Sequence, residues 1–450
     1  MTTATTVNVP DLIDEQKVSP FQIRILVLCA LAAALDGFAA QMIGYVAPSV
    51  AREMHLRPAA LTPIFAWGLV GLMLGALTFG PIADRFGRKP VIVLCTLFYG
   101  LVTLATVKAD SVSSLVILRF LAGMGFGGVM PNAIALTAEY SPHRRRGTMI
   151  TIMFCGFPIG ATIAGFATAR ILQTHSWRGV FLLAGVMPLL LVPALAVMLP
   201  ESIRHIVIHG GKTERVRQLL ARVNPQLIFD KNVNFVVREE RVPGMPVVHL
   251  FRQGRALSTI LLWIGFFMSL IDIYLLTSWL PTVINNAGIT LSLAVIATAV
   301  FQGGGVVASL ALGAFVDRFG AFRVLTITYF LGALSVASLG YAHSIAAIMV
   351  CTFFAGAGVI GGQTGANALA ATIYPTYIRS TGVGWALGIG RIGSVVGPVF
   401  GGIMLSLHLP LTTVFLAGAL PSLIGGCAIF LMGRAQISLH SKSTLSVAAS

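Results

Sequence analysis

Four ionisable side chains stand inside long apolar stretches of this sequence, namely Asp36, Arg119, Asp272 and Arg391. Burial in an apolar medium disfavours the charged form of a carboxyl group, so Asp36 and Asp272 are candidates for taking up and releasing a proton. An arginine keeps its charge and presents a planar pair of donors that matches a carboxylate. Arg119 and Arg391 are therefore candidates for binding an organic anion.

Each of these residues also has a structural interpretation. Asp36 precedes Gly37, which can loosen the helix and admit water, but the carboxyl group can instead hydrogen-bond a neighbouring helix. Asp272 can pair with Arg391, although the apolar stretch that holds Arg391 contains no acid of its own. Arg119 lies nearer the end of its stretch, so its side chain can reach a membrane surface.

Neutral amides form a second set of candidates at the same depth. An amide in an apolar segment binds a ligand or hydrogen-bonds another helix. The residues are Asn132, Gln302, Gln363 and Asn367.

The composition places these residues in a bilayer. The 450 residues are 56% hydrophobic and 10% charged, with a mean hydropathy of +0.88, far from the values of soluble globular proteins. Twelve apolar stretches, six in each half, are long enough to cross about 30 Å of hydrocarbon. The sequence therefore predicts an all-α membrane protein. Its net charge of +15 comes from basic residues between the apolar stretches, which argues against a nucleic-acid partner.

A charged turn between two apolar stretches occurs twice. Asp84-Arg85-Phe86-Gly87 and Asp317-Arg318-Phe319-Gly320 lie 233 positions apart, and the same offset relates Pro142 to Pro375. Two landmarks in one register indicate an internal duplication and two pseudo-symmetric six-helix bundles.

The charged residues in and near these turns are predicted to control conformational change at the membrane surface, where acids cap or pair with helix ends. They are Asp84, Arg85, Arg88, Glu139, Arg146, Asp317, Arg318 and Arg379.

The basic residues also predict orientation, because loops rich in lysine and arginine stay in the cytoplasm. Both termini are then cytoplasmic. The predicted parts are a tail at 1–22, a six-helix bundle at 23–199, a cytoplasmic central segment at 200–255, a second bundle at 256–433 and a tail at 434–450. Within the central segment, Thr213 to Val223 has the spacing of an amphipathic helix, and a solvated linker is the alternative.

The sequence indicates neither an enzyme nor a metal protein. It has no nucleotide-binding Walker loop and no Ser-His-Asp elbow, its five cysteines follow no metal-ligand spacing, and His205 and His209 lack further ligands. We expect no cofactor and a proton gradient as the energy source.

The whole chain resembles the major facilitator superfamily, through the duplicated turn, the twelve spans and the long central segment. Within it, the chain is similar to the aromatic acid:proton symporters. The resemblance rests on Asp36-Gly37-Phe38-Ala39-Ala40-Gln41, Pro200-Glu201-Ser202-Ile203-Arg204, Ser278-Trp279-Leu280-Pro281, and the stretch from Tyr374 to Gly382 continued to Gly390-Arg391-Ile392-Gly393. It implies a monomer in a bacterial-type inner membrane that imports a benzoate-like acid with protons by alternating access.

One departure concerns the first motif. The family usually has a second acid where this chain has Ala39, which bears on both substrate choice and coupling. The alternatives are a carrier for another organic anion, a sugar or a drug on the same fold, and a membrane receptor that binds without transporting.

Overall fold

The computed structural model describes residues 6–210, 213–227, 229, 233–237, 246–252, 255–374 and 378–448, with the side chains of 246, 371, 379, 380 and 436–448 excepted. Twelve helices in this part of the chain are long and apolar enough to cross a membrane. A helix satisfies every backbone hydrogen bond within its own segment, which hydrocarbon requires. The all-α membrane fold predicted from the sequence is confirmed.

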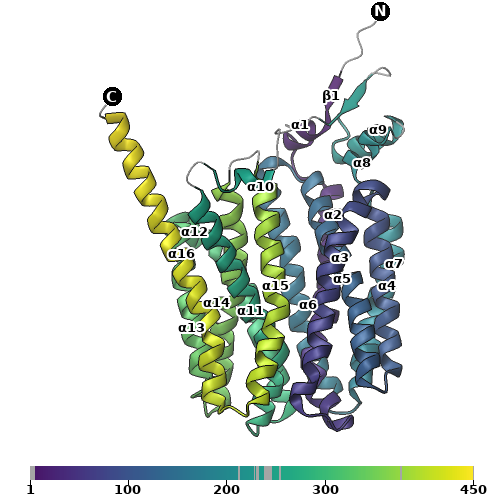
Figure 1. Cartoon of the computed structure of the whole chain (residues 1–450). Coiled ribbons are helices and arrows are strands. Elements are labelled where there is room, and N and C mark those ends of the chain that lie inside the picture. The colour runs from purple at the N-terminus through teal and green to yellow at the C-terminus, as the bar shows by residue number, and fades with distance from the viewer. Residues whose placement is uncertain are drawn as a thin grey trace, which may run out of the picture. The chain divides into compact units, whose positions relative to one another are not determined.

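The first six long helices are α2 (Pro20–Glu53), α3 (Thr62–Phe86), α4 (Arg88–Ala105), α5 (Val112–Tyr140), α6 (Arg146–Ile171) and α7 (Trp177–Met198). The second six are α11 (Ala256–Asn286), α12 (Leu291–Phe319), α13 (Ala321–Leu339), α14 (Ile345–Ile373), α15 (Arg379–Ser406) and α16 (Leu411–Ala448). Figure 1 shows them as the long coiled ribbons.

The helix boundaries repeat in the register of the duplicated turn. The helices α2 and α11, α3 and α12, and α5 and α14 end 233 positions apart. The starts of α5 and α14, and of α6 and α15, are related by the same offset. The duplication therefore extends over the helices of both halves.

The two copies of the turn share a backbone conformation. Gly87 stands between α3 and α4 with φ +100°, and Gly320 stands between α12 and α13 with φ +86°. Residues with a side chain rarely adopt this left-handed region, so glycine is required where the chain reverses within one residue. The predicted tight bend is confirmed in both copies.

The N-terminal tail and the central segment contain the shorter elements. These are β1 (Thr6–Asn8), α1 (Val9–Asp14), α8 (Ile203–Ile208), α9 (Thr213–Val223), β2 (Asn234–Val236) and α10 (Pro246–His249). The strands pair in parallel, with Val7 opposite Phe235 (Figure 1). The sequence analysis described the tail and the central segment as separate parts. The pairing of β1 with β2 joins residues more than 200 positions apart, and such a pairing leaves no local pattern in the sequence.

The segment from Thr213 to Val223 forms the helix α9, so the predicted amphipathic helix is confirmed over the solvated linker. Its apolar residues Val216, Leu219, Leu220 and Val223 are buried. The helix packs against α8 and β2, and Asn224 Nδ2 donates to Gln16 Oε1 at 2.7 Å. Protein therefore covers the apolar side of this helix.

The chain forms two compact units, and neither is one run of sequence. Unit 1 comprises Met1–Met42, Trp67–Ala161 and Arg178–Glu240, and unit 2 comprises Ile43–Ala66, Thr162–Trp177 and Arg241–Ser450. Unit 2 thus combines the second six helices with short segments of the first half. The two units are defined by contacts between residues, whereas the predicted bundles at 23–199 and 256–433 are defined by the sequence duplication. The units therefore do not test the predicted boundaries, which stay a prediction.

The carboxylate of Glu201 caps the start of α4 in unit 1. Its Oε1 accepts hydrogen bonds from the backbone N–H groups of Arg88 and Ser202, both at 2.8 Å, and of Lys89 at 3.3 Å. A negative charge here complements the helix dipole and satisfies N–H groups that have no partner within the helix. The sequence analysis missed this role, since Glu201 lies more than 110 residues after Arg88 and Lys89, whose N–H groups it caps.

The capping arrangement leads to a prediction about Gly87. A Cβ atom at Gly87 would lie 2.4 Å from Glu201 Oε2, whereas one at Gly320 would meet no atom within 4 Å. Both Gly→Ala changes impose a left-handed conformation that costs about 1 to 2 kcal/mol. We expect Gly87→Ala to cost a further ~1 kcal/mol through the displaced cap, measured as a lower Tm in detergent.

The matched variant is Gly320→Ala, which isolates the backbone cost. When Glu201→Ala is already present, Gly87→Ala should lower the Tm by no more than Gly320→Ala does. Equal losses for both glycine variants in the natural background would show that Glu201 has no part in the turn's stability.

Candidate functional site

Asp36 is buried in unit 1, with 2% of its surface exposed. It interacts electrostatically with Cys95 and Tyr99 on α4. The Tyr99 ring lies 4.7 Å, centroid to centroid, from that of Phe126 on α5, and its hydroxyl has no hydrogen-bond partner among the described residues. A phenol near a buried carboxyl group is the residue that the sequence analysis missed, because its position depends on how α2, α4 and α5 pack.

Gly37 serves close packing in the structure. A Cβ atom on it would lie 2.0 Å from the carbonyl oxygen of Phe157 on α6. Gly156 and Gly160 of α6 approach the carbonyl groups of Ala30 and Ala34 in the same way, and α2 is a continuous helix through this region. The idea that Gly37 loosens the helix is therefore wrong, and small residues instead bring α2 and α6 into contact.

Arg119 on α5 points into unit 1, with 4% of its surface exposed. Its Nη1 donates to the carbonyl oxygen of Ala39 at 3.3 Å and its Nη2 to that of Ala40 at 3.4 Å. The guanidinium carbon lies 5.7 Å from the centroid of the Phe126 ring. Because the side chain is enclosed by protein, it does not reach toward a surface in this structure.

The charge of Arg119 has no acidic counterpart within the described part of the chain. No carboxylate in the described part of the chain forms an ion pair with it, and its Nε has no hydrogen-bond partner there. The carbonyl dipoles of Ala39 and Ala40 compensate the positive charge only in part, so the guanidinium can accept an anion.

Asp272 on α11 is fully buried in unit 2. Its Oδ2 accepts a hydrogen bond from the Ser422 hydroxyl of α16, while its Oδ1 has no partner among the described residues. It also interacts electrostatically with Tyr329 of α13. No ion pair joins it to Arg391 in the described chain, so the predicted partnership between the two is wrong.

The duplication adds a relation between the halves. Asp272 stands 233 positions after Ala39, and Ser269 stands 233 positions after Asp36. Each half therefore carries one acid at these two positions. The first half has it at the first position, as Asp36, and the second half has it at the second position, as Asp272.

Arg391 on α15 is half-buried in unit 2, and its guanidinium forms no hydrogen bond or ion pair with any described residue. Its helix is held against α11 by Gly390 and Gly393, where Cβ atoms would lie 2.8 Å from the Leu270 side chain and 2.3 Å from the carbonyl oxygen of Phe267. This close packing fixes the backbone of α15 while the charged end of Arg391 remains available to a ligand.

The four predicted amides make no hydrogen bond to another helix within the described residues. Asn132 donates to the carbonyl of Gly128 in its own helix at 2.7 Å, and Gln363 donates to Asn367 Oδ1 at 3.1 Å within α14. The Nε2 of Gln302 and the Oε1 of Gln363 are buried without a partner in the same part of the chain. The interhelical interpretation is therefore wrong for these amides, and ligand binding stays a prediction.

The two acids of the charged turns do not make the contacts with helix ends that the sequence predicts. Asp84 and Asp317 are exposed, and their carboxylates form no hydrogen bond or ion pair with the described chain, so the capping predicted for them belongs to Glu201 in unit 1. Arg85 and Arg318 lie over the rings of the phenylalanines that follow them, at 5.5 and 5.3 Å from the centroids.

Three other predicted surface residues, Arg88, Glu139 and Arg146, form ion pairs in unit 1. Arg88 Nη1 lies 2.8 Å from Glu139 Oε1, with both side chains mostly buried. Arg146 pairs with Asp14 of α1 and donates to the carbonyl of Ser141 at 3.3 Å. Arg379 begins α15, and its side chain lies outside the described residues, as does Pro375.

Solved structures show which class of protein has this fold. A bacterial homologue of the human lysosomal transporter Spinster, in an inward-facing and occupied conformation, matches 93% of this chain and 98% of its own with a TM-score of 0.70 at 17% identity. The xylose transporter XylE from E. coli matches 92% of this chain and 96% of its own with a TM-score of 0.68 at 18% identity. The fold is that of multi-pass membrane transporters.

The family follows from the sequence match. The chain belongs to the Major Facilitator Superfamily, which matches residues 29–297 and 262–444. It is a transporter and not an enzyme.

Several relatives align over almost the whole chain. The gallate transporter of Pseudomonas putida is 39% identical over 96% of this chain and 96% of its own. The 4-hydroxybenzoate transporter PcaK of Pseudomonas aeruginosa is 37% identical over 94% of each chain, and the benzoate transport protein of Acinetobacter baylyi is 35% identical over 95% of this chain and 92% of its own.

The bond between Asp272 and Ser422 leads to a prediction about stability. Ser422→Ala removes an interhelical hydrogen bond to a buried carboxyl group, and we expect a loss of about 1 to 2 kcal/mol, seen as a lower Tm in detergent. The matched variant is Ser394→Ala, because Ser394 is also fully buried but donates to the carbonyl of Arg391 in its own helix. That bond contributes little. An equally large fall in Tm for Ser394→Ala would show that the hydrogen bond from Ser422 to Asp272 does not stabilise the protein.

Proposed function

We propose that this protein imports an aromatic carboxylate, such as benzoate or a hydroxybenzoate, in symport with protons by alternating access. The proposal deepens the family assignment by naming a substrate class and an energy source. The substrate class is supported by the relatives described as transporters of gallate, 4-hydroxybenzoate and benzoate.

The proposal rests on two guanidinium groups that have no acidic partner among the residues that the structure describes. Arg119 is buried in unit 1, and Arg391 is half-buried in unit 2. Burying a cation without an anion is costly, and the cost falls when a carboxylate binds. A cationic drug or a neutral sugar supplies no such charge, so an organic anion fits these residues better.

Proton coupling is assigned to the buried carboxyl groups. Asp36 is the leading candidate, because it lies in the same unit as Arg119 with a phenol and a thiol nearby. Asp272 is the second, because it stands in register with Ala39 and keeps one oxygen without a partner among the described residues. Gln302, Gln363, Asn367 and Asn132 are proposed to orient the substrate's polar groups.

The proposed location is a bacterial-type inner membrane with both termini in the cytoplasm. This orientation leaves most basic residues of the connecting segments on the cytoplasmic side. The residues of the charged turns, with the Arg88–Glu139 and Arg146–Asp14 pairs in unit 1, then lie at that surface, where we propose that they govern conformational exchange.

The proposal is tested by uptake of a panel of radiolabelled aromatic acids into cells that express the protein. We expect accumulation of benzoate-type acids that collapses with a protonophore and rises as external pH falls, until the substrate itself becomes protonated. Uptake of sugars or cationic drugs in place of aromatic acids, or accumulation that ignores the protonophore, would contradict it.

The anion contact is tested by Arg391→Lys. This change keeps the charge but removes the planar pair of donors, so at least one charge-assisted hydrogen bond of about 1.5 kcal/mol is lost. We expect equilibrium binding of 4-hydroxybenzoate to the purified protein to weaken about tenfold or more. Since Arg119 is buried, Arg119→Lys should weaken binding as well.

The matched control is Arg434→Lys, an exposed arginine on α16 in the same unit. The Arg434→Lys variant should bind 4-hydroxybenzoate with the same affinity as the natural protein. Unchanged affinity in Arg391→Lys would remove this residue from the substrate site.

Coupling is tested by Asp36→Asn. The neutral amide resembles the protonated carboxyl group, so the loaded carrier can reorient but cannot release a proton. We expect loss of uphill accumulation with some downhill exchange retained, measured in proteoliposomes with and without an imposed pH gradient. Asp272→Asn should reduce accumulation in part.

Glu214→Gln, on the exposed side of α9, controls for the removal of a carboxylate. If Asp36→Asn still concentrates substrate in a protonophore-sensitive manner, coupling must move to Asp272 or to another group.

A further inference from the structure

A groove of about 420 Å³ opens between α12 and α13 in unit 2, over α14. Its floor is formed by the small side chains Ala308, Ala311 and Ala357. The helix α14 packs closely on both neighbours, since Gly356 meets the backbone of Phe301 and Gly358 meets that of Gly332. The small residues keep the space between α12 and α13 open.

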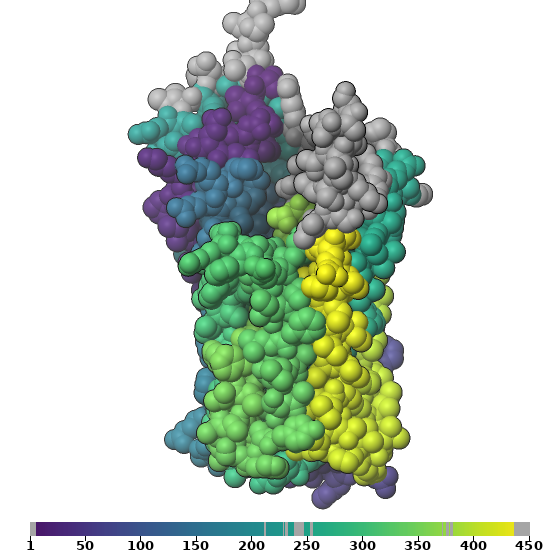
Figure 2. All heavy atoms as spheres, turned by 90° about the vertical axis from the view of Figure 1, so that its left-hand side faces the viewer, coloured from purple at the N-terminus to yellow at the C-terminus, as the bar shows by residue number. Residues whose placement is uncertain are grey.

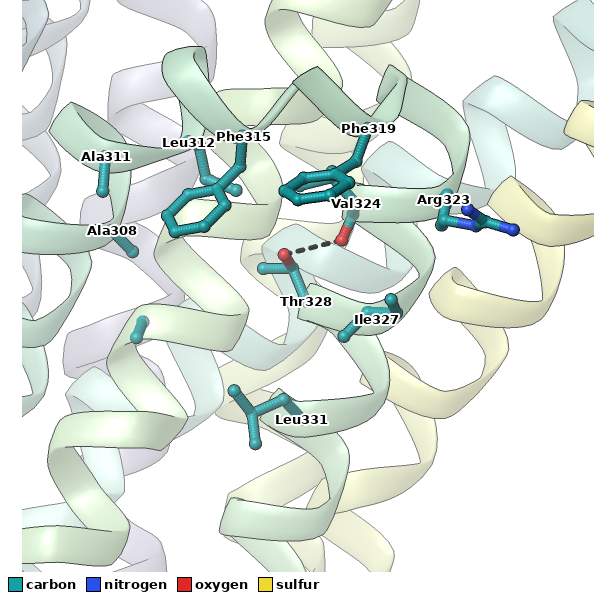
Figure 3. Close-up of a pocket in the computed structure, with 11 residues that line it drawn as sticks. Ala308, Ala311, Leu312, Phe315, Phe319, Arg323, Val324, Ile327, Thr328 and Leu331 are labelled. Atoms are coloured by element: carbon teal, nitrogen blue, oxygen red, sulfur yellow. Dashed lines mark hydrogen bonds between the residues drawn. The ribbon is translucent and has the colours of Figure 1, made fainter. Parts of the chain in front are cut away.

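The walls of the groove are apolar. Phe315 and Phe319 of α12 have rings stacked at 6.4 Å between centroids and are about half exposed, and Figure 3 shows them beside Ile327 and Thr328 of α13. The one hydroxyl there, of Thr328, donates to the carbonyl of Val324 in its own helix at 2.8 Å (Figure 3). The walls therefore present a surface suited to hydrocarbon.

The surrounding face is apolar as well. Figure 2 looks onto the side of unit 2 on which α13 and α16 lie. The exposed side chains of these two helices include Ile327, Leu334, Leu420 and Leu431. These helices are long and apolar enough to cross a membrane. The face is suited to contact with lipid chains.

A positive charge stands at one end of the groove. Arg323 lines it, beyond Phe319 and Val324 in Figure 3, and Arg318 lies in the same turn. The turn also holds Asp317, which leaves it net positive. No ion pair joins Arg318 or Arg323 to an acid among the described residues.

We propose that this groove binds an anionic phospholipid, with an acyl chain between α12 and α13 and the headgroup phosphate on Arg323. The stretch of α12 from Ala308 to Phe319 is about 16 Å long at 1.5 Å per residue. One leaflet of a bilayer has a hydrocarbon depth of about 15 Å, half of the full core. A chain that lies along the groove therefore reaches the membrane surface where α12 ends, and basic pockets at such surfaces attract anionic headgroups.

Two other occupants fit less well. An aromatic acid would place its carboxylate on Arg323 but would fill only a small part of a groove that continues over several turns. A second copy of the chain would bring a net positive charge from the corresponding face, because the charged side chains near the groove are Asp317, Arg318 and Arg323.

The test is native mass spectrometry of the full-length protein in detergent, titrated with phosphatidylglycerol or phosphatidylcholine. We expect phosphatidylglycerol to bind more tightly. Arg323→Gln should weaken that binding about fivefold, the ratio that corresponds to about 1 kcal/mol for one basic residue near a membrane surface. Arg434→Gln removes an exposed arginine outside the groove and should leave the affinity unchanged.

Filling the groove provides a second, independent variant. Ala357→Trp should abolish binding of phosphatidylglycerol, and Ala311→Phe should do so if the tryptophan variant does not fold. The matched control is Ala346→Trp, in the exposed first turn of the same helix α14 and outside the groove.

Each alternative has its own outcome. Equal binding of both lipids, or unchanged phosphatidylglycerol affinity in Arg323→Gln, would overturn the proposal. Displacement of bound lipid by 4-hydroxybenzoate would assign the groove to the aromatic acid, and loss of dimers in Ala357→Trp would assign it to a second copy.

Discussion

Hydrocarbon supplies no hydrogen-bond partner to a backbone amide or to a charged side chain, and this constraint governs the protein from its helices to its site. The described part of the chain meets this constraint with twelve long helices, within which the backbone groups satisfy one another. The side chains that break the rule are then few. Asp36, Arg119, Asp272 and Arg391 are each costly in such surroundings, so each needs a partner from the protein or from a ligand.

The partners differ among these four residues. Asp272 has a serine hydroxyl on a neighbouring helix, and Arg119 has two backbone carbonyl groups and no acid among the described residues. Arg391 has no partner among the described residues, and close glycine contacts hold its helix in place. Asp272 is thus supported by a hydroxyl of the protein, whereas the two arginines are compensated incompletely by the described residues. This distribution of charge fits the proposed carrier of anions and protons.

The duplicated turns show how the two halves have diverged within one backbone plan. Gly87 and Gly320 share a left-handed conformation, and the helices on either side share their boundaries. The charges are not shared, because the positions of Arg88, Glu139 and Glu201 correspond to Ala321, Thr372 and Arg434. The first half therefore has a capped helix and an ion pair at its turn. The second half has basic residues there that form no ion pair with an acid among the described residues, beside the groove between α12 and α13.

The sequence by itself determined the twelve helices, the duplication, the tight turns and the family, because apolar length, a repeated motif and glycine are local signals. It also singled out the buried charges. Only the tertiary structure decided their partners: Ser422 for Asp272, the carbonyls of Ala39 and Ala40 for Arg119, and Glu201 rather than Asp84 as a helix cap. Such partners lie 79 to 150 residues apart in the chain. No periodicity records which faces of the helices meet, since that depends on how small residues let the helices approach.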